Sequence, residues 1–151
     1  MSAGKFLIRW IVVFIVSNAL GFVGHGFLLK STYLALSKAN PGIMRTEADS
    51  QAHFLWMLLA FAIQAAAIVW IYAKGNTGGA WLGQGIRFGV AIWAVSSAFM
   101  YLIYYDVQPW PGMVTARQMG WDFIALLLVG IVIAGLSKND AAAARSKGVG
   151  A

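Results

Sequence analysis

Four stretches of the chain run for about the thickness of a bilayer without an aspartate, glutamate, lysine or arginine. They lie between Arg9 and Lys30 (20 residues), Asp49 and Lys74 (24), Arg87 and Asp106 (18), and Asp122 and Lys138 (15). A helix needs roughly 20 apolar residues to cross the hydrocarbon core, because each residue advances it by about 1.5 Å. The fourth stretch reaches this length only if Asp122 enters the membrane. The sequence therefore predicts four spans, at residues 6–29, 52–73, 86–105 and 117–137.

The overall composition is also that of a protein surrounded by lipid. Of the 151 residues, 60% are hydrophobic and only 11% are charged, whereas a soluble domain needs many more charged side chains to cover its surface. The net charge of +6 comes from basic residues scattered singly between apolar runs, which is not the basic patch of a nucleic-acid-binding protein. Helices are favoured over strands, because a barrel of so few strands cannot close. We expect an all-α, polytopic transmembrane four-helix bundle with no nucleic-acid partner.

The distribution of basic residues predicts the orientation of this bundle. An even number of spans places both termini and the loop between spans two and three on one side of the membrane. That side carries seven basic residues: Lys5, Arg9, Lys74, Arg87, Lys138, Arg145 and Lys147. The other side carries four: Lys30, Lys38, Arg45 and Arg117. Because basic residues stay in the cytoplasm, both termini are predicted there. Residues 1–138 then form the transmembrane domain, and residues 139–151 form a flexible cytoplasmic tail.

Small residues mark the faces on which the predicted helices pack. Lipid tails are as apolar as leucine, so helices associate in a membrane through close backbone approach and interhelical hydrogen bonds. Gly21 lies on such a face of span one, and Gly85, Gly89 and Ser96 lie on the corresponding face of span three. Gly85 and Gly89 also form a GxxxG pattern, which is consistent with packing inside the bundle or with a dimer interface.

Four ionisable side chains gather at the outer end of the predicted bundle. They are His25 near the end of span one, His53 near the start of span two, Asp106 at the end of span three, and Asp122 just inside span four. A charged side chain inside the bilayer costs about 2.5–3.5 kcal/mol on insertion scales, so such residues face the bundle and find partners. We expect Asp122 to accept a hydrogen bond from one of the histidines or from Arg117.

This cluster has four interpretations. The first is a structural hydrogen-bond network that fixes the positions of the helices. The second is a haem b whose iron has His25 and His53 as axial ligands. The third is a divalent metal ion bound by the two histidines and Asp122. The fourth is a path for protons or a solute through Asp122, His53 and Gln64. The sequence leaves all four open, and the cofactor stays unknown.

Two segments of the chain resemble small, uncharacterised four-span inner-membrane proteins of bacteria. They are WLGQGIRFG at residues 81–89 and YLIYYDVQPWPG at residues 101–112. The likeness continues into the fourth predicted span and covers roughly the last 70 residues. It implies a location in the bacterial inner membrane, and it provides no catalytic or binding residues to transfer.

The sequence gives little sign of catalysis. It has no cysteine, no nucleotide-binding loop, no Ser/His/Asp order and no HExxH zinc helix. The extramembrane segments are too short to form a soluble catalytic domain. We therefore expect a non-catalytic accessory or assembly subunit, with lipid and either other membrane subunits or a second copy as its partners. The alternatives are a small transporter or proton-conducting protein, and a haem b-binding electron carrier.

Overall fold

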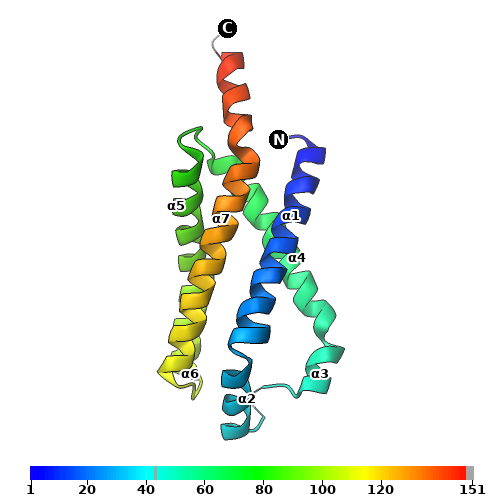
Figure 1. Cartoon of the computed structure of the whole chain (residues 1–151), viewed down its shortest axis with the longest axis vertical. Helices are drawn as coiled ribbons and strands as arrows, with labels where there is room; N and C mark the ends of the chain where they lie inside the picture. The colour runs from blue at the N-terminus through cyan, green and yellow to red at the C-terminus, as the bar shows by residue number, and fades with distance from the viewer. Residues whose placement is uncertain (43, 149–151) are drawn as a thin grey trace.

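The computed structural model describes residues 1–42 and 44–148, with the side chains of residues 1–42 and 44–140. This part of the chain is all-helical and has no strand (Figure 1), which confirms the predicted fold class. In chain order the elements are α1 (Ala3–Gly21), the π-helical segment η1 (Phe22–Leu28), α2 (Lys30–Ala39), α3 (Glu47–Ala52), α4 (Phe54–Gly75), α5 (Trp81–Trp93), the π-helical segment η2 (Ala94–Ala98), α6 (Phe99–Val107) and α7 (Gly112–Gly148).

Four helical stretches within the described residues are long and apolar enough to cross a membrane, as expected for a multi-pass membrane protein. They are Ala3–Leu28, Phe54–Gly75, Trp81–Val107 and Gly112–Asp140. Each overlaps one predicted span, and the third and fourth helical stretches begin before it, at residues 81 and 112. A helix can extend beyond the part of it that lies in the membrane, so the predicted span bounds stay a prediction.

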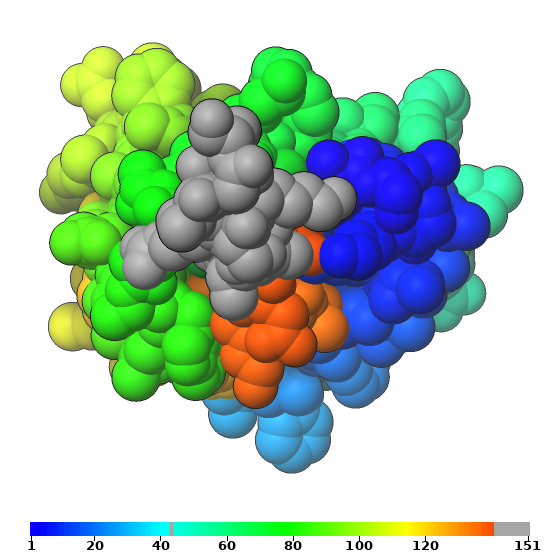
Figure 2. Space-filling model, turned by 90° about the horizontal axis from the view of Figure 1, so that it is seen from above, coloured from blue at the N-terminus to red at the C-terminus, as the bar shows by residue number. Residues whose placement is uncertain are grey.

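The long helix α7 lies at the centre of the arrangement. The first residues of α1 and the last residues of α7 lie at the same end of the bundle (Figure 1), which is called the end of the termini below, and the view from that end shows α7 between α1 and α5 (Figure 2). Helix α1 packs on α4 and α7, and α5 packs on α7. The core between α1, α4 and α7 is apolar, with Val13, Ala65, Ile68, Val69, Tyr72, Val129, Ile133 and Ala134 all buried. This core fills the half of the bundle that is nearer the termini.

Glycines allow α5 and α7 to approach each other at backbone distance. A Cβ atom on Gly89 would lie 2.7 Å from the carbonyl oxygen of Leu126, and one on Gly85 would lie 2.8 Å from the carbonyl oxygen of Gly130. A Cβ atom on Gly130 would in turn meet the backbone of α5. The GxxxG pattern of α5 is therefore used for packing inside the chain.

The two other residues assigned to packing differ in what they contact. Gly21 lies against α4, since a Cβ atom there would be 2.8 Å from Cζ of Phe61. Ser96 instead donates a hydrogen bond of 2.6 Å to the carbonyl oxygen of Ile92 in its own helical run. A serine hydroxyl in a membrane helix satisfies itself in this way when no partner on another helix is in reach.

An ionic contact joins α1 to α7 at the end of the termini. The carboxylate of Asp140 lies 2.6 Å from Nη2 of Arg9 and 2.6 Å from Nζ of Lys5. The same Nη2 donates to the carbonyl oxygen of Leu136 at 2.9 Å. The predicted tail begins at residue 139, yet α7 continues as a helix to Gly148. The flexibility of the predicted tail stays a prediction, and residues 149–151 lie outside the described part.

Candidate functional site

His25 is held between a tyrosine and an aspartate inside the half of the bundle that is farther from the termini. Its Nε2 lies 2.9 Å from Oδ1 of Asp122 on α7, and its Nδ1 lies 2.6 Å from the hydroxyl oxygen of Tyr33 on α2. The His25 and Tyr33 rings are stacked, with an angle of 11° between their planes. The sequence predicts that one of the two histidines or Arg117 is the hydrogen-bond partner of Asp122, and in the structure this partner is His25.

The hydrogen bonds of His25 continue through Tyr33 to Gln118 on α7. The amide Nε2 of Gln118 donates to the hydroxyl oxygen of Tyr33 at 3.1 Å. One placement of hydrogens that fits these distances has the Tyr33 hydroxyl donating to Nδ1 of His25 and the Nε2–H of His25 donating to Asp122. Burial raises the pKa of the Tyr33 phenol above its usual range, which keeps this donor protonated.

The backbone around His25 is a π-helix, and two contacts with α7 accompany it. Gly24 is buried, and a Cβ atom there would overlap the indole ring of Trp121. The indole N–H of Trp121 donates to the carbonyl oxygen of Leu20 at 3.0 Å, just before the π-helical segment begins. A side chain that enters a helical hydrogen-bond ladder in this way locally reshapes the helix. Trp121 therefore stabilises the π-helical turn in which His25 faces Asp122. Trp121 and Asp122 are adjacent in the sequence.

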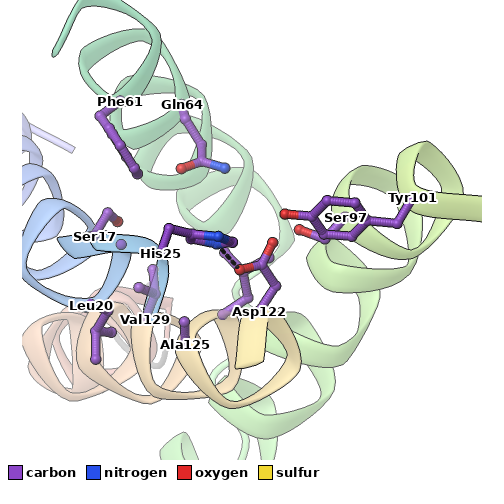
Figure 3. A pocket seen from close by; sticks show the side chains of 12 residues that line it. Ser17, Leu20, His25, Phe61, Gln64, Ser97, Tyr101, Asp122, Ala125 and Val129 are labelled. Atoms are coloured by element: carbon purple, nitrogen blue, oxygen red, sulfur yellow. Dashed lines mark hydrogen bonds and ion pairs between the residues drawn. The ribbon is translucent and has the colours of Figure 1, made fainter. Parts of the chain in front are cut away.

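A cavity of about 230 Å³ lies beside the His25–Asp122 pair. Its polar lining consists of Ser17, His25, Gln64, Ser97, Tyr101 and Asp122. Figure 3 shows the Asp122 carboxylate between the His25 ring and the Tyr101 hydroxyl, which points toward it. Ser97 belongs to the second π-helical segment, η2, so that each of the two π-helical segments places a residue on this cavity. The polar side chains come from α1, η1, α4, η2, α6 and α7.

A larger and mainly apolar groove of about 690 Å³ adjoins this cavity. It is lined by residues of α1, η1 and α4 and by Tyr101, and the two hollows share Gly21, His25, Phe61 and Tyr101. In Figure 1, α4 diverges from α1 toward α3 at this end, and residues of both helices line the groove. The polar cavity thus continues into a groove between two membrane-spanning helices.

The structure separates the other predicted site residues from the His25–Asp122 pair, with one exception. Gln64 lines the same cavity as Asp122. His53 lies where α3 meets α4, and its Nδ1 is 2.8 Å from the carbonyl oxygen of Asp49. Asp106 is exposed near the end of α6. Arg117 is exposed as well and donates a hydrogen bond of 3.4 Å to the hydroxyl of Thr32. The four ionisable groups share one end of the bundle without forming one cluster.

The positions of His25, His53 and Asp122 can be compared with the predicted metal and haem sites. The described residues contain no group of three or more His, Asp or Glu that could hold a metal ion, so the set of two histidines and Asp122 is not brought together. Both ring nitrogens of His25 are hydrogen-bonded, and iron would have to displace Tyr33 or Asp122. His53 lines neither of the two hollows that His25 lines. Haem ligation by the two histidines stays a prediction.

Several residues around the His25–Asp122 pair were not identified from the sequence. Tyr33 contacts Nδ1 of His25 without lining the cavity, and it lies beyond residue 29, where the first predicted span ends. Tyr101 and Ser97 line the cavity, and their spacing of four residues puts them on one helical face. Ser17 gave no signal, because a single serine in a membrane helix is usually satisfied by its own backbone. Tyr101 lies on α6, whereas His25 and Asp122 lie on η1 and α7, so only the packing of the helices brings Tyr101 to the cavity.

Comparison of the chain with protein families, curated proteins and solved structures finds no match. The resemblance to small inner-membrane proteins of bacteria therefore stays a prediction, and the function has to be argued from the cavity.

Proposed function

We propose that this chain is a membrane-embedded binding protein that holds a lipid-soluble small molecule in the polar cavity beside His25 and Asp122. The main support for the proposal is that both π-helical segments contribute a residue to the lining of this cavity, His25 from η1 and Ser97 from η2. π-Helical segments are rare, and they occur frequently at functional sites. Packing alone does not require them, since α-helices with small residues already bring α5 and α7 together.

An unsatisfied polar group in the cavity supports the same proposal. The hydroxyl oxygen of Ser17 is buried and has no hydrogen-bond partner among the described residues. Burial of an unpaired hydroxyl costs free energy, most of all inside a membrane where water is scarce. A polar group of a bound molecule would provide the missing partner. Ligand pockets typically combine a mostly apolar wall with a few converging polar groups, and the cavity and its adjoining groove have this composition.

Native mass spectrometry of the protein, extracted in mild detergent from a bacterial membrane, tests the proposal. Ala125 lines the cavity, so Ala125→Leu fills part of it without removing a polar group. Ala67 on α4 is exposed to lipid and lines neither hollow, which makes Ala67→Leu the matched control. We expect the wild type and Ala67→Leu to retain a small-molecule adduct that Ala125→Leu loses while keeping its melting temperature. Identical spectra for all three proteins would refute a binding role for the cavity.

Two functions expected from the sequence are less well supported than binding. A path for protons or a solute has to continue through the bundle, but buried apolar side chains occupy the half nearer the termini, among them Val13, Val69 and Ile133. An accessory or assembly role was expected because catalytic motifs are missing and the extramembrane segments are short, and neither observation identifies a partner. The accessory role therefore stays a prediction.

We also propose that both termini face the cytoplasm of a bacterial cell and that the cavity lies toward the outer side of its inner membrane. The seven basic residues on the side of the termini, against four on the other side, support this orientation. Reporter fusions at residues 1 and 151 test it. A reporter that fluoresces only in the cytoplasm should be active at both ends, and activity at one end alone would contradict the orientation.

A further inference from the structure

The charge of the cavity restricts the chemistry of a ligand. Asp122 is 17% exposed in its side chain, and its Oδ1 lies 2.9 Å from Nε2 of its hydrogen-bond partner His25. No lysine or arginine occurs among the residues that line the cavity or the groove. Asp122 is the one acidic side chain of this described lining, and no lysine or arginine of the lining neutralises it. Because an isolated charge in a membrane is costly, this carboxylate favours a cation as its partner.

Aromatic side chains surround the route from the groove to this carboxylate. Phe61 and Tyr101 line both hollows, and Phe14, Phe22 and Phe54 line the groove. The faces of aromatic rings attract cations, and the attraction increases when water is excluded. The same rings also provide apolar contact for a hydrocarbon chain. An aromatic lining next to a single carboxylate fits a molecule that is apolar along most of its length and positively charged at one end.

The groove provides access from the bilayer. It lies between α1 and α4, where the two helices diverge (Figure 1), and it joins the cavity at Gly21, His25, Phe61 and Tyr101. A molecule dissolved in the membrane reaches the cavity by moving sideways between these two helices. This route does not cross the apolar core on the side of the termini.

We infer that the ligand of the cavity is a lipophilic monocation, which enters between α1 and α4 and places its charged end against Asp122 with its apolar part in the groove. This inference rests on the proposed binding function and names the class of ligand. A neutral lipid or a fatty acid carries no charge that complements Asp122.

A series of three probes of equal chain length tests the charge preference. Dodecyltrimethylammonium, dodecanol and dodecyl sulfate are titrated against the full chain in phosphatidylcholine nanodiscs, and empty nanodiscs correct for partition into lipid. We expect saturable binding of the cation, with an affinity at least tenfold above that of the alcohol and the sulfate. Equal or tighter binding of either of these two probes would overturn the inference, because it would show that the carboxylate does not select the ligand.

Two carboxylate variants locate the charge that is responsible. Asp122→Asn should weaken binding of the cation at least tenfold. Asp106→Asn removes an exposed carboxylate at the same end of the bundle and should leave the affinity unchanged. If Asp122→Asn binds the cation as the wild type does, the inference is wrong. Should this variant fail to fold, the three probes on the wild type still decide the question.

The failure of this inference can be told apart from failure of the proposed function. If the alcohol or the sulfate binds and Ala125→Leu abolishes that binding, the cavity binds ligands but does not select cations. If none of the probes binds and the mass spectra show no adduct, both proposals fail. If the cation binds equally well to Ala125→Leu and to the wild type, it occupies another surface and the inference fails.

Discussion

Replacement of Gly89 by alanine should separate the two helices that pack most closely in this protein. The added Cβ atom would lie 2.7 Å from the carbonyl oxygen of Leu126 and 2.8 Å from Cα of Leu127, whereas ordinary van der Waals contact begins at 3.4 Å. Both neighbours are backbone atoms, so no side chain can rotate away. Helices α5 and α7 must therefore move apart by about 0.7 Å at this point.

The expected cost follows from two opposing contributions. Overpacking of this kind destabilises a protein by about 1–3 kcal/mol, while the change from glycine to alanine in a helix gains about 1 kcal/mol. Gly83 lies on the same helix, and a Cβ atom there would meet nothing within 4 Å, so Gly83→Ala should show only the gain. The free energies of unfolding of the two variants should therefore differ by about 1–3 kcal/mol, with Gly89→Ala the less stable.

Unfolding in mixed micelles with increasing dodecyl sulfate, followed by circular dichroism, measures this difference. If the free energies of unfolding of the two variants agree within about 0.5 kcal/mol, the close approach of α5 to α7 is not needed for stability. A change in oligomeric state for Gly89→Ala, with unchanged stability of the monomer, would instead assign the GxxxG pattern to an interface between copies.

Two further substitutions test contacts that join distant parts of the chain. Asp140→Asn should destabilise the fold by about 1.5–3 kcal/mol, because it leaves the buried guanidinium of Arg9 without its anionic partner. Lys5→Gln should cost less than about 1 kcal/mol, since this side chain is 57% exposed, and equal effects of the two substitutions would refute the argument. Tyr33→Phe should lower the free energy of unfolding by about 1–3 kcal/mol in the same assay, because it removes the hydroxyl that links His25 to the side-chain amide of Gln118 on α7. Tyr105→Phe, at a tyrosine that is 52% exposed, should be neutral, and a comparable loss there would indicate a general effect of losing a hydroxyl.

The hydrogen-bond partner of Asp122 could be predicted only in part from the sequence. Membrane insertion makes an unpaired Asp122 unfavourable, and this argument correctly indicates a nearby donor. It does not distinguish between donors, and the structure selects His25 while His53 lies at the junction of α3 and α4. The choice depends on the divergence of α4 from α1, which moves the start of α4 away from α7. Span lengths and hydropathy carry no information on that angle.

The sequence by itself determines that the chain is all-helical and crosses the membrane four times, because the bilayer requires about 20 apolar residues for each crossing and no unsatisfied backbone. It also identifies the glycines on which α5 packs, since close approach of backbones needs small residues at helical spacing. Only the tertiary structure decides that two helical runs widen into π-helical turns at His25 and Ser97 and that a cavity opens between them. Such turns depend on contacts between residues distant in sequence, as Trp121 against Gly24 shows. The pattern of residues along a single helix cannot predict those contacts.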